Sequence, residues 1–284
     1  MAFYSIQGLL AEGKDRPLWQ IILEDDCQDR GATAEDSIAR MTKLWNAMGE
    51  TDSSYDPAKR SRSGLVGGGA DRLEKCKTPL CGDFLQEVMA TALRTGECNA
   101  CMGRIVAAPT AGASGVLPAV LLPLQRSEGI SDEKMVHALF VAAAFGQVIA
   151  SRASISGAEG GCQAEIGSAS GMAAAALVFL RGGTGEQMSA ACATALQNLM
   201  GLVCDPVAGL VEVPCVGHNV IGALNALSAA DLALCNAASP IPCDEVIDAM
   251  RSVGEAMPTS LRETGKGGIA ATPTGKRLAE EFFR

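Results

Sequence analysis

The chain has 284 residues, of which 48% are hydrophobic and 19% are charged, and its formal net charge is -9 at pH 7. This hydrophobic content excludes an extended disordered chain, and the acidic balance argues against a nucleic-acid-binding protein. The N-terminus lacks a basic start followed by an apolar stretch and a cleavage site, so we expect a cytoplasmic protein whose 11 cysteines are reduced.

Alanine is abundant along the chain, whereas β-branched runs with strict alternation are nearly absent. Both features favour helices over strands, so the sequence predicts an all-α protein. No internal repeat is visible, and we expect one compact multi-helix domain over residues 1–284.

The first predicted helix begins after Thr33, which has the character of an N-cap, with Asp36 in the capping-box position. Its apolar residues recur at helical spacing until the helix ends near Gly49. A second helix is predicted with Leu80 on its apolar face and with Gly96 as its stop.

The longest uncharged run is Ile105–Gln125, which has the length of a membrane span. It contains Pro109, Pro118 and Pro123, and its alanines and glycines are only weakly lipophilic. We therefore expect no membrane segment there.

A third helix is predicted to open at Ser131, with Asp132 and Glu133 at its positive dipole end. The stretch Val141–Leu180 carries few charges, so it is expected to form the centre of the fold. Later helices are predicted over 186–200, 218–234 and 244–257, with a short last helix from residue 275.

Glycine- and serine-rich segments interrupt these helices at 61–70, 108–115, 154–165 and 204–219. Loops of this kind expose backbone N–H groups, which suit an anionic ligand or the sulfurs of a metal cluster. The alternative is that small residues merely allow close helix packing.

Three cysteines lie at rigid corners of these segments: Cys162 follows two glycines, Cys204 stands two residues before a proline, and Cys215 directly follows one. Such corners suit metal-ligating thiolates, but the spacing matches no zinc ribbon and no ferredoxin run. Cys98 and Cys101 form a CxxC without a second pair or a βαβ context, so we expect two buried or half-buried thiols there.

Four segments, APTAGASGVLPAVL, EGGCQAEIGSASGMAAAAL, CDPVAGLVEVPC and MPTSLRETGKGGIAATPTG, resemble the catalytic α chain of the bacterial iron–sulfur L-serine dehydratases. The resemblance covers nearly the whole chain and is weakest over residues 15–60. It implies a [4Fe-4S] cluster held by Cys162, Cys204 and Cys215, with one iron left open as a Lewis acid.

The same resemblance implies conversion of L-serine to pyruvate and ammonia, a step of amino-acid catabolism that feeds gluconeogenesis, without pyridoxal phosphate. Some single-chain relatives end in a cysteine that reaches the cluster, whereas this chain ends LAEEFFR. The fourth ligand is then water, substrate or another group. A separate β subunit, an oligomer and a general base that could lie on the partner are further expectations.

The candidate substrate contacts lie in the glycine-rich loops. They are Ser63, Thr110, Ser114 and Lys266. Lys266 could contact a carboxylate or simply face solvent. His218 and Asn219 follow the last cysteine ligand closely, so they are candidates for catalysis or, equally, for helix capping.

Two other functions remain open at this point. A desulfidase acting on L-cysteine would use the same elimination with sulfide as the leaving group. A cluster-bearing sensor without turnover would also place thiolates in glycine-rich loops.

Overall fold

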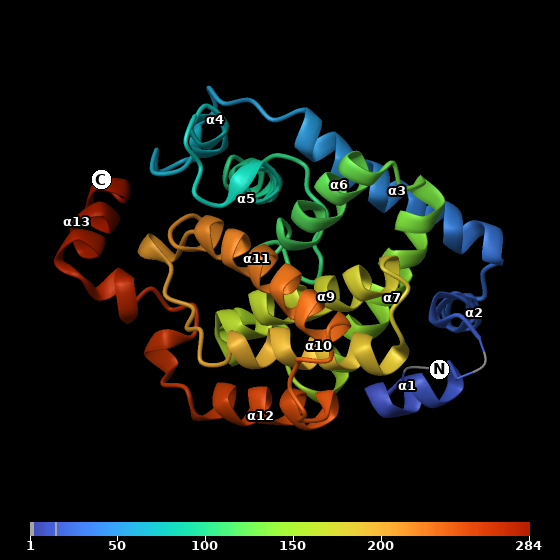
Figure 1. Cartoon of the computed structure of the whole chain (residues 1–284). Helices are drawn as coiled ribbons and strands as arrows, with labels where there is room; N and C mark the ends of the chain where they lie inside the picture. The colour runs from blue at the N-terminus through green and yellow to red at the C-terminus, as the bar shows by residue number, and fades with distance from the viewer. Residues whose placement is uncertain (1–2, 15) are drawn as a thin grey trace.

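The computed structural model describes residues 3–14 and 16–284. This part of the chain is built of helices, which are arranged around a central helix, α9 (Figure 1). The α-helices are α1 Ile6–Glu12, α2 Leu18–Arg30, α3 Ala34–Ser53, α4 Gly69–Glu74, α5 Gly82–Ala100, α6 Val116–Glu128, α7 Asp132–Arg152, α8 Gly157–Gly160, α9 Ser168–Leu180, α10 Gly185–Asn198, α11 Cys215–Leu234, α12 Cys243–Ala256 and α13 Pro273–Phe282. Short π- and 3₁₀-helical segments lie between them: η1 Gln163–Gly167, η2 Val207–Gly209, η3 Thr259–Leu261 and η4 Gly268–Ala271. The all-α prediction is confirmed, because the described residues contain no strand beyond one isolated bridge.

The predicted start of α3 is confirmed in detail. The Thr33 hydroxyl accepts a hydrogen bond from the Asp36 backbone N–H at 3.1 Å, and the Asp36 carboxylate accepts one from the Thr33 N–H at 3.3 Å. This reciprocal bonding satisfies two free donors of the first turn. The predicted end near Gly49 is wrong, because the helix continues to Ser53. A glycine inside a helix does not end the helix when tertiary packing stabilises the next turn.

The start and the end predicted for α5 differ from the structure. Leu80 precedes the helix and is fully exposed, so it does not belong to an apolar face. Gly96 does not stop the helix, which runs on to Ala100. A Cβ at Gly96 would lie 3.2 Å from Cγ1 of Val216 in α11, so this glycine serves close approach of two helices.

The centre of the fold lies where it was predicted. The Ser131 hydroxyl caps α7 by accepting from the Lys134 N–H at 3.3 Å. Helix α9 is buried along nearly its whole length and contacts α6, α7, α10 and α11. Four consecutive alanines, 173–176, have no exposed surface, which allows these neighbouring helix axes to come close.

Two helical stretches are apolar and long enough to span a membrane by composition alone, Asp132–Arg152 and Gln163–Leu180. Their windows are 67% and 89% buried inside the protein, as expected for core helices. The uncharged run Ile105–Gln125 forms a loop followed by most of α6, with Pro123 inside that helix.

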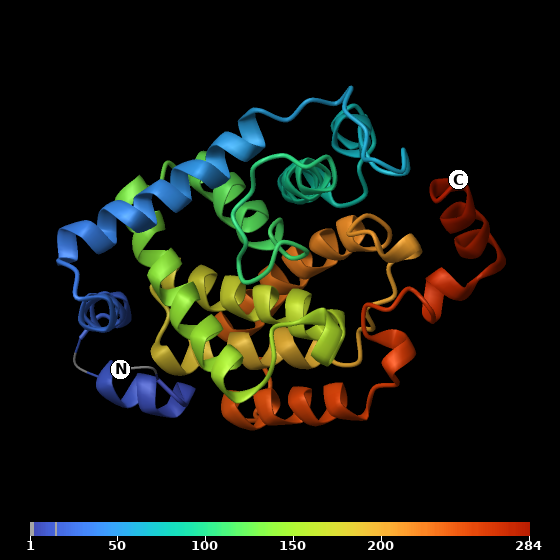
Figure 2. The same cartoon turned by 180° about the vertical axis from the view of Figure 1, so that it is seen from behind.

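The C-terminal third folds back along the glycine-rich loops. Helix α11 begins at Cys215, three residues before the predicted start at His218, so its first turn carries a cysteine. Helix α13 packs against η2 and η4. Both views place the N- and C-termini on opposite sides of the molecule, with α13 at the edge (Figures 1 and 2).

Candidate metal centre

The three cysteines singled out from the sequence are all buried. Cys162 is 3% exposed at the start of η1, Cys204 is 2% exposed in the loop after α10, and Cys215 is 7% exposed at the start of α11. The described part of the chain holds these thiols free of disulfides. Three separate segments therefore contribute one thiol each.

Cys162 is positioned by a tight turn. Gly161 has φ 76°, and a Cβ there would lie 2.9 Å from the Leu202 carbonyl oxygen, so a side chain is excluded. The adjacent Gln163 is clamped from both sides: its Nε2 donates to the Met250 carbonyl at 3.0 Å, and its Oε1 accepts from the Gly201 N–H at 2.8 Å. These contacts fix the backbone on either side of the thiol.

Cys204 is held through its backbone by the C-terminal segment. Its N–H donates to the Leu261 carbonyl at 2.9 Å, and its carbonyl accepts from the Glu263 N–H at 2.8 Å. The next residue, Asp205, is buried, and its Oδ2 accepts from the Ile269 N–H at 2.6 Å. The segment around residues 261–269 thus sets the position of this thiol.

Cys215 is connected to the first glycine-rich loop through Glu212. The buried Glu212 carboxylate accepts hydrogen bonds from the Ser61 hydroxyl at 2.6 Å and from the Ser63 hydroxyl. Its carbonyl accepts from the Val216 N–H at 3.0 Å. Ser63, a predicted substrate contact, is therefore engaged with protein groups.

The thiols share one electrostatic environment. A hydrogen bond with Cys204, followed by burial, raises the pKa of Cys162 far above its ordinary value. Burial, followed by the charge of Cys204, raises the pKa of Cys215 to about 12. Without a metal, these thiols therefore hold protons that a metal would displace on binding.

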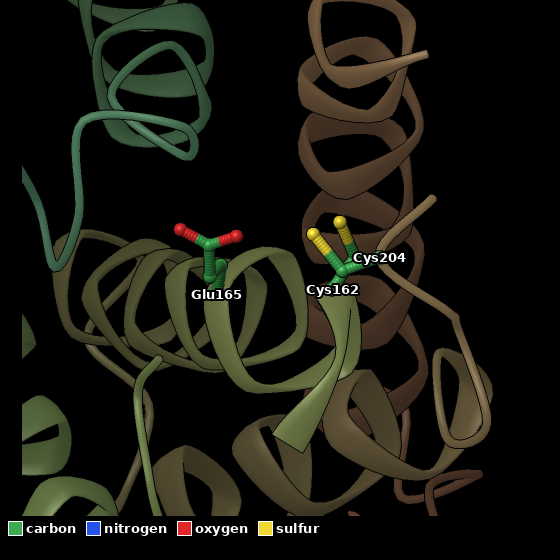
Figure 3. A group of neighbouring side chains, drawn as sticks. All are labelled: Cys162, Glu165 and Cys204. Atoms are coloured by element: carbon green, nitrogen blue, oxygen red, sulfur yellow. The ribbon is translucent and has the colours of Figure 1, made fainter. Parts of the chain in front are cut away.

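A carboxylate joins this group. Ligand atoms of Cys162, Glu165 and Cys204 all lie within 4.8 Å of one another, and Figure 3 shows both sulfurs and the carboxylate on the same side of their elements. Burial raises the pKa of Glu165, while the Thr110 hydroxyl donates to its Oε1 at 2.7 Å. Cys215 lies outside this 4.8 Å group but acts electrostatically on Cys162.

Sequence reasoning gave Glu165 no role. A signal was present, because this carboxylate is one of few charges in the apolar stretch Val141–Leu180 and follows Cys162 by three residues. A charge in such a position requires a partner or a function.

Asn219 connects the 108–115 loop to α11. Its Oδ1 accepts from the Gly115 N–H at 2.8 Å, and its Nδ2 donates to the Gly112 carbonyl at 2.8 Å and to the Cys215 carbonyl at 3.0 Å. All these partners are backbone groups, so the amide orders the loop that carries Thr110.

Two other predicted residues have unused polar atoms. The Ser114 hydroxyl and His218 Nδ1 are buried without a hydrogen-bond partner among the described residues. Burial lowers the pKa of His218, which favours the neutral imidazole. Buried polar atoms without a partner can form hydrogen bonds with a bound ligand. Lys266 is exposed, on the loop that carries Ile269.

The CxxC is separate from this group. Cys98 and Cys101 are half-buried, as predicted, and burial raises the pKa of both thiols. Within residues 3–14 and 16–284, the cluster of Cys162, Glu165 and Cys204 is the one group of three or more potential metal ligands.

Comparison of the sequence with known proteins places the chain in a family. Residues 13–270 match the family model described as serine dehydratase alpha chain. The chain belongs to this family. A probable L-serine dehydratase alpha chain of Bacillus subtilis is 46% identical over 99% of this chain and 95% of its own length. The L-serine dehydratase alpha chain of Peptoniphilus asaccharolyticus is 40% identical over 94% of this chain and 93% of its own.

Other members of the serine dehydratase alpha chain family match within longer proteins. An L-serine dehydratase of Helicobacter pylori strain J99 is 39% identical over 82% of this chain, but the match covers 54% of its own length. In such relatives, about half of the protein has no counterpart in the chain described here.

Proposed function

We propose that this chain is the catalytic α chain of an L-serine dehydratase, which converts L-serine to pyruvate and ammonia, and that residues 1–284 form its catalytic domain. Cys162, Cys204 and Cys215 would hold a [4Fe-4S] cluster. The observation that carries the proposal is the convergence of buried cysteines from three segments, in a member of the serine dehydratase alpha chain family.

The residues fit such a group. Thiolates are the ligands that iron–sulfur clusters use, and all three thiols are free and shielded from solvent. Cys215 lies outside the close group of Cys162 and Cys204 but acts electrostatically on Cys162, so all three thiols belong to one site. When bound, the cluster supplies a Lewis-acidic iron that makes the β-hydroxyl a better leaving group. Pyridoxal phosphate is not part of this scheme.

The chain's own residues have two tasks in the reaction: binding the substrate and accepting the Cα proton. Ser114 offers an unpartnered hydroxyl for the substrate carboxylate, and His218 offers Nδ1 to accept the proton. The β-hydroxyl leaves as water, and the resulting aminoacrylate tautomerises to an imine. Water then hydrolyses the imine to pyruvate and ammonia.

A separate β subunit is part of the proposal. Relatives in which this chain's counterpart covers about half of the protein carry additional chain that would here arrive as a partner. The holoenzyme would then be an oligomer of α and β chains in the cytoplasm, acting in amino-acid catabolism and gluconeogenesis.

The test is anaerobic reconstitution of the chain with iron and sulfide, alone and with the β chain, followed by metal analysis and turnover of L-serine and L-cysteine. Replacing Cys162, Cys204 or Cys215 by alanine should abolish cluster binding. Cys98→Ala and Cys101→Ala are matched controls that should retain it. Equal loss of the cluster in Cys98→Ala would contradict the ligand assignment, and turnover of L-cysteine in preference to L-serine would contradict the substrate.

A further inference from the structure

Three thiolates cannot satisfy four irons, so one coordination position of a [4Fe-4S] cluster in this pocket needs another donor. Glu165 is the carboxylate that the structure places beside the thiols, within 4.8 Å of Cys162 and Cys204. It extends to the same side as both sulfurs (Figure 3). Glu165 projects from η1, and Cys162 directly precedes η1. The same short segment therefore fixes the positions of this carboxylate and of the Cys162 thiol.

The carboxylate lies in a slot between two glycines. A Cβ at Gly112 would lie 3.2 Å from its Oε1, and a Cβ at Gly157 would lie 2.6 Å from its Oε2 and 3.1 Å from the Cys204 sulfur. Any larger residue at either position would displace the carboxylate. Oε1 is occupied by the Thr110 hydroxyl, so Oε2 is the oxygen that faces the Cys204 side.

Among the other carboxylates near the thiols, Glu263 acts electrostatically on Glu165 and Cys215 but is exposed. Asp205 accepts a backbone N–H, and Glu212 accepts two serine hydroxyls. Thr110, in contrast, orients Glu165 as outer hydrogen-bond partners orient metal-binding carboxylates.

We propose that the Glu165 carboxylate binds the iron that carries no cysteine in the resting enzyme, and that L-serine replaces it there. This inference rests on the proposed function. Substrate binding is then an exchange of one oxygen ligand on the iron for another. The released carboxylate keeps its hydrogen bond from Thr110 and remains beside the substrate.

The test compares the wild-type chain with Glu165→Gln and Glu165→Ala, each reconstituted with a cluster, reduced with dithionite and placed in water enriched in oxygen-17. Electron–nuclear double resonance then reports whether a water oxygen is bound to iron. The wild-type cluster should show no such coupling before L-serine is added, whereas both variants should show it. Glu159→Gln, a change at an exposed carboxylate of the same segment, is the matched control and should behave as wild type.

Lability of the fourth iron gives a second readout that does not depend on turnover. Thr110→Val removes the hydrogen bond that orients the carboxylate, and should increase the rate of loss of one iron about 10-fold. Bound water in the wild-type enzyme, or no bound water in either Glu165 variant, would overturn the inference while leaving the cluster and the proposed function intact. Failure of every chain to take up iron, also in the presence of the β chain, would overturn the proposed function and this inference together.

Discussion

Gly157 offers a sharp test of how closely the candidate metal centre is packed. Alanine adds one methyl group, which would lie 2.6 Å from Oε2 of Glu165 and 3.1 Å from the sulfur of Cys204. The backbone of Gly157 is not in the left-handed region, so Gly157→Ala introduces no backbone strain and its effect is purely steric. Both neighbours are held in place, Glu165 by Thr110 and Cys204 by its backbone bonds, so neither can move without breaking contacts.

Overpacking of this kind costs about 1 to 3 kcal/mol, and we expect the metal-free Gly157→Ala chain to lose stability of that order. Displacing a thiol and a carboxylate of the proposed cluster site should also weaken iron retention about 10- to 100-fold. Thermal unfolding of the metal-free chain and iron analysis after anaerobic reconstitution measure the two effects separately.

Gly217 is the matched control for this substitution. It lies in α11 two residues after Cys215, and a Cβ there would meet no atom within 4 Å. Gly217→Ala should stabilise the chain by about 0.5 to 1 kcal/mol, because alanine favours the helix, and should retain iron. A Gly157→Ala chain that is as stable as wild type and retains its iron would refute the steric reasoning.

Three further predictions follow from the contacts around the pocket. Because the folded-state pKa of Cys215 is raised to about 12, this thiol stabilises the metal-free fold fully below pH 9, and the stabilisation is lost as pH rises toward 12. Between pH 8 and 11 (about the range of thiol titration), the unfolding free energy of Cys215→Ala should fall less steeply with pH than that of the wild type. An identical slope would contradict the raised pKa of Cys215. Asn219→Ala leaves backbone groups of the 108–115 loop unpaired and should cost about 2 to 5 kcal/mol, measured by urea unfolding, with an unchanged midpoint as the contrary result. Ser61→Ala and Ser63→Ala should each destabilise the fold and should couple in a double-mutant cycle, because both hydroxyls donate to the same Glu212 oxygen; strict additivity would count against this shared acceptor.

Capping residues in the sequence predicted the starts of α3 and α7. The capping residues Thr33 and Ser131 act on backbone groups three residues away, so their meaning is contained in the sequence around them. Gly96 was misread because its role depends on Val216, which is distant in sequence and packs against it in the fold. The same residue type marks a stop in one context and a close helix contact in another.

The candidate site was predictable only in part, because tertiary contacts place its members. Spacing alone left the roles of the cysteines open, since Cys204 owes its position to backbone bonds with Leu261 and Glu263. The neighbouring glycines and prolines singled out the three cysteines, and the resemblance to a known family gave them the role of cluster ligands. The structure places Cys162 and Cys204 in one group. Glu165 was missed because its meaning emerges only when Thr110 and Cys204 lie beside it.

The backbone pairing of Cys204 with residues 261 and 263 also orders events during synthesis of the protein. All three cysteines leave the ribosome before the segment that fixes one of them. A nascent chain therefore exposes free thiols without the geometry to hold a metal. Insertion of the proposed cluster would then follow synthesis of residues 261–263, and a chain truncated before residue 261 would carry all three cysteines but would lack the backbone partners of Cys204.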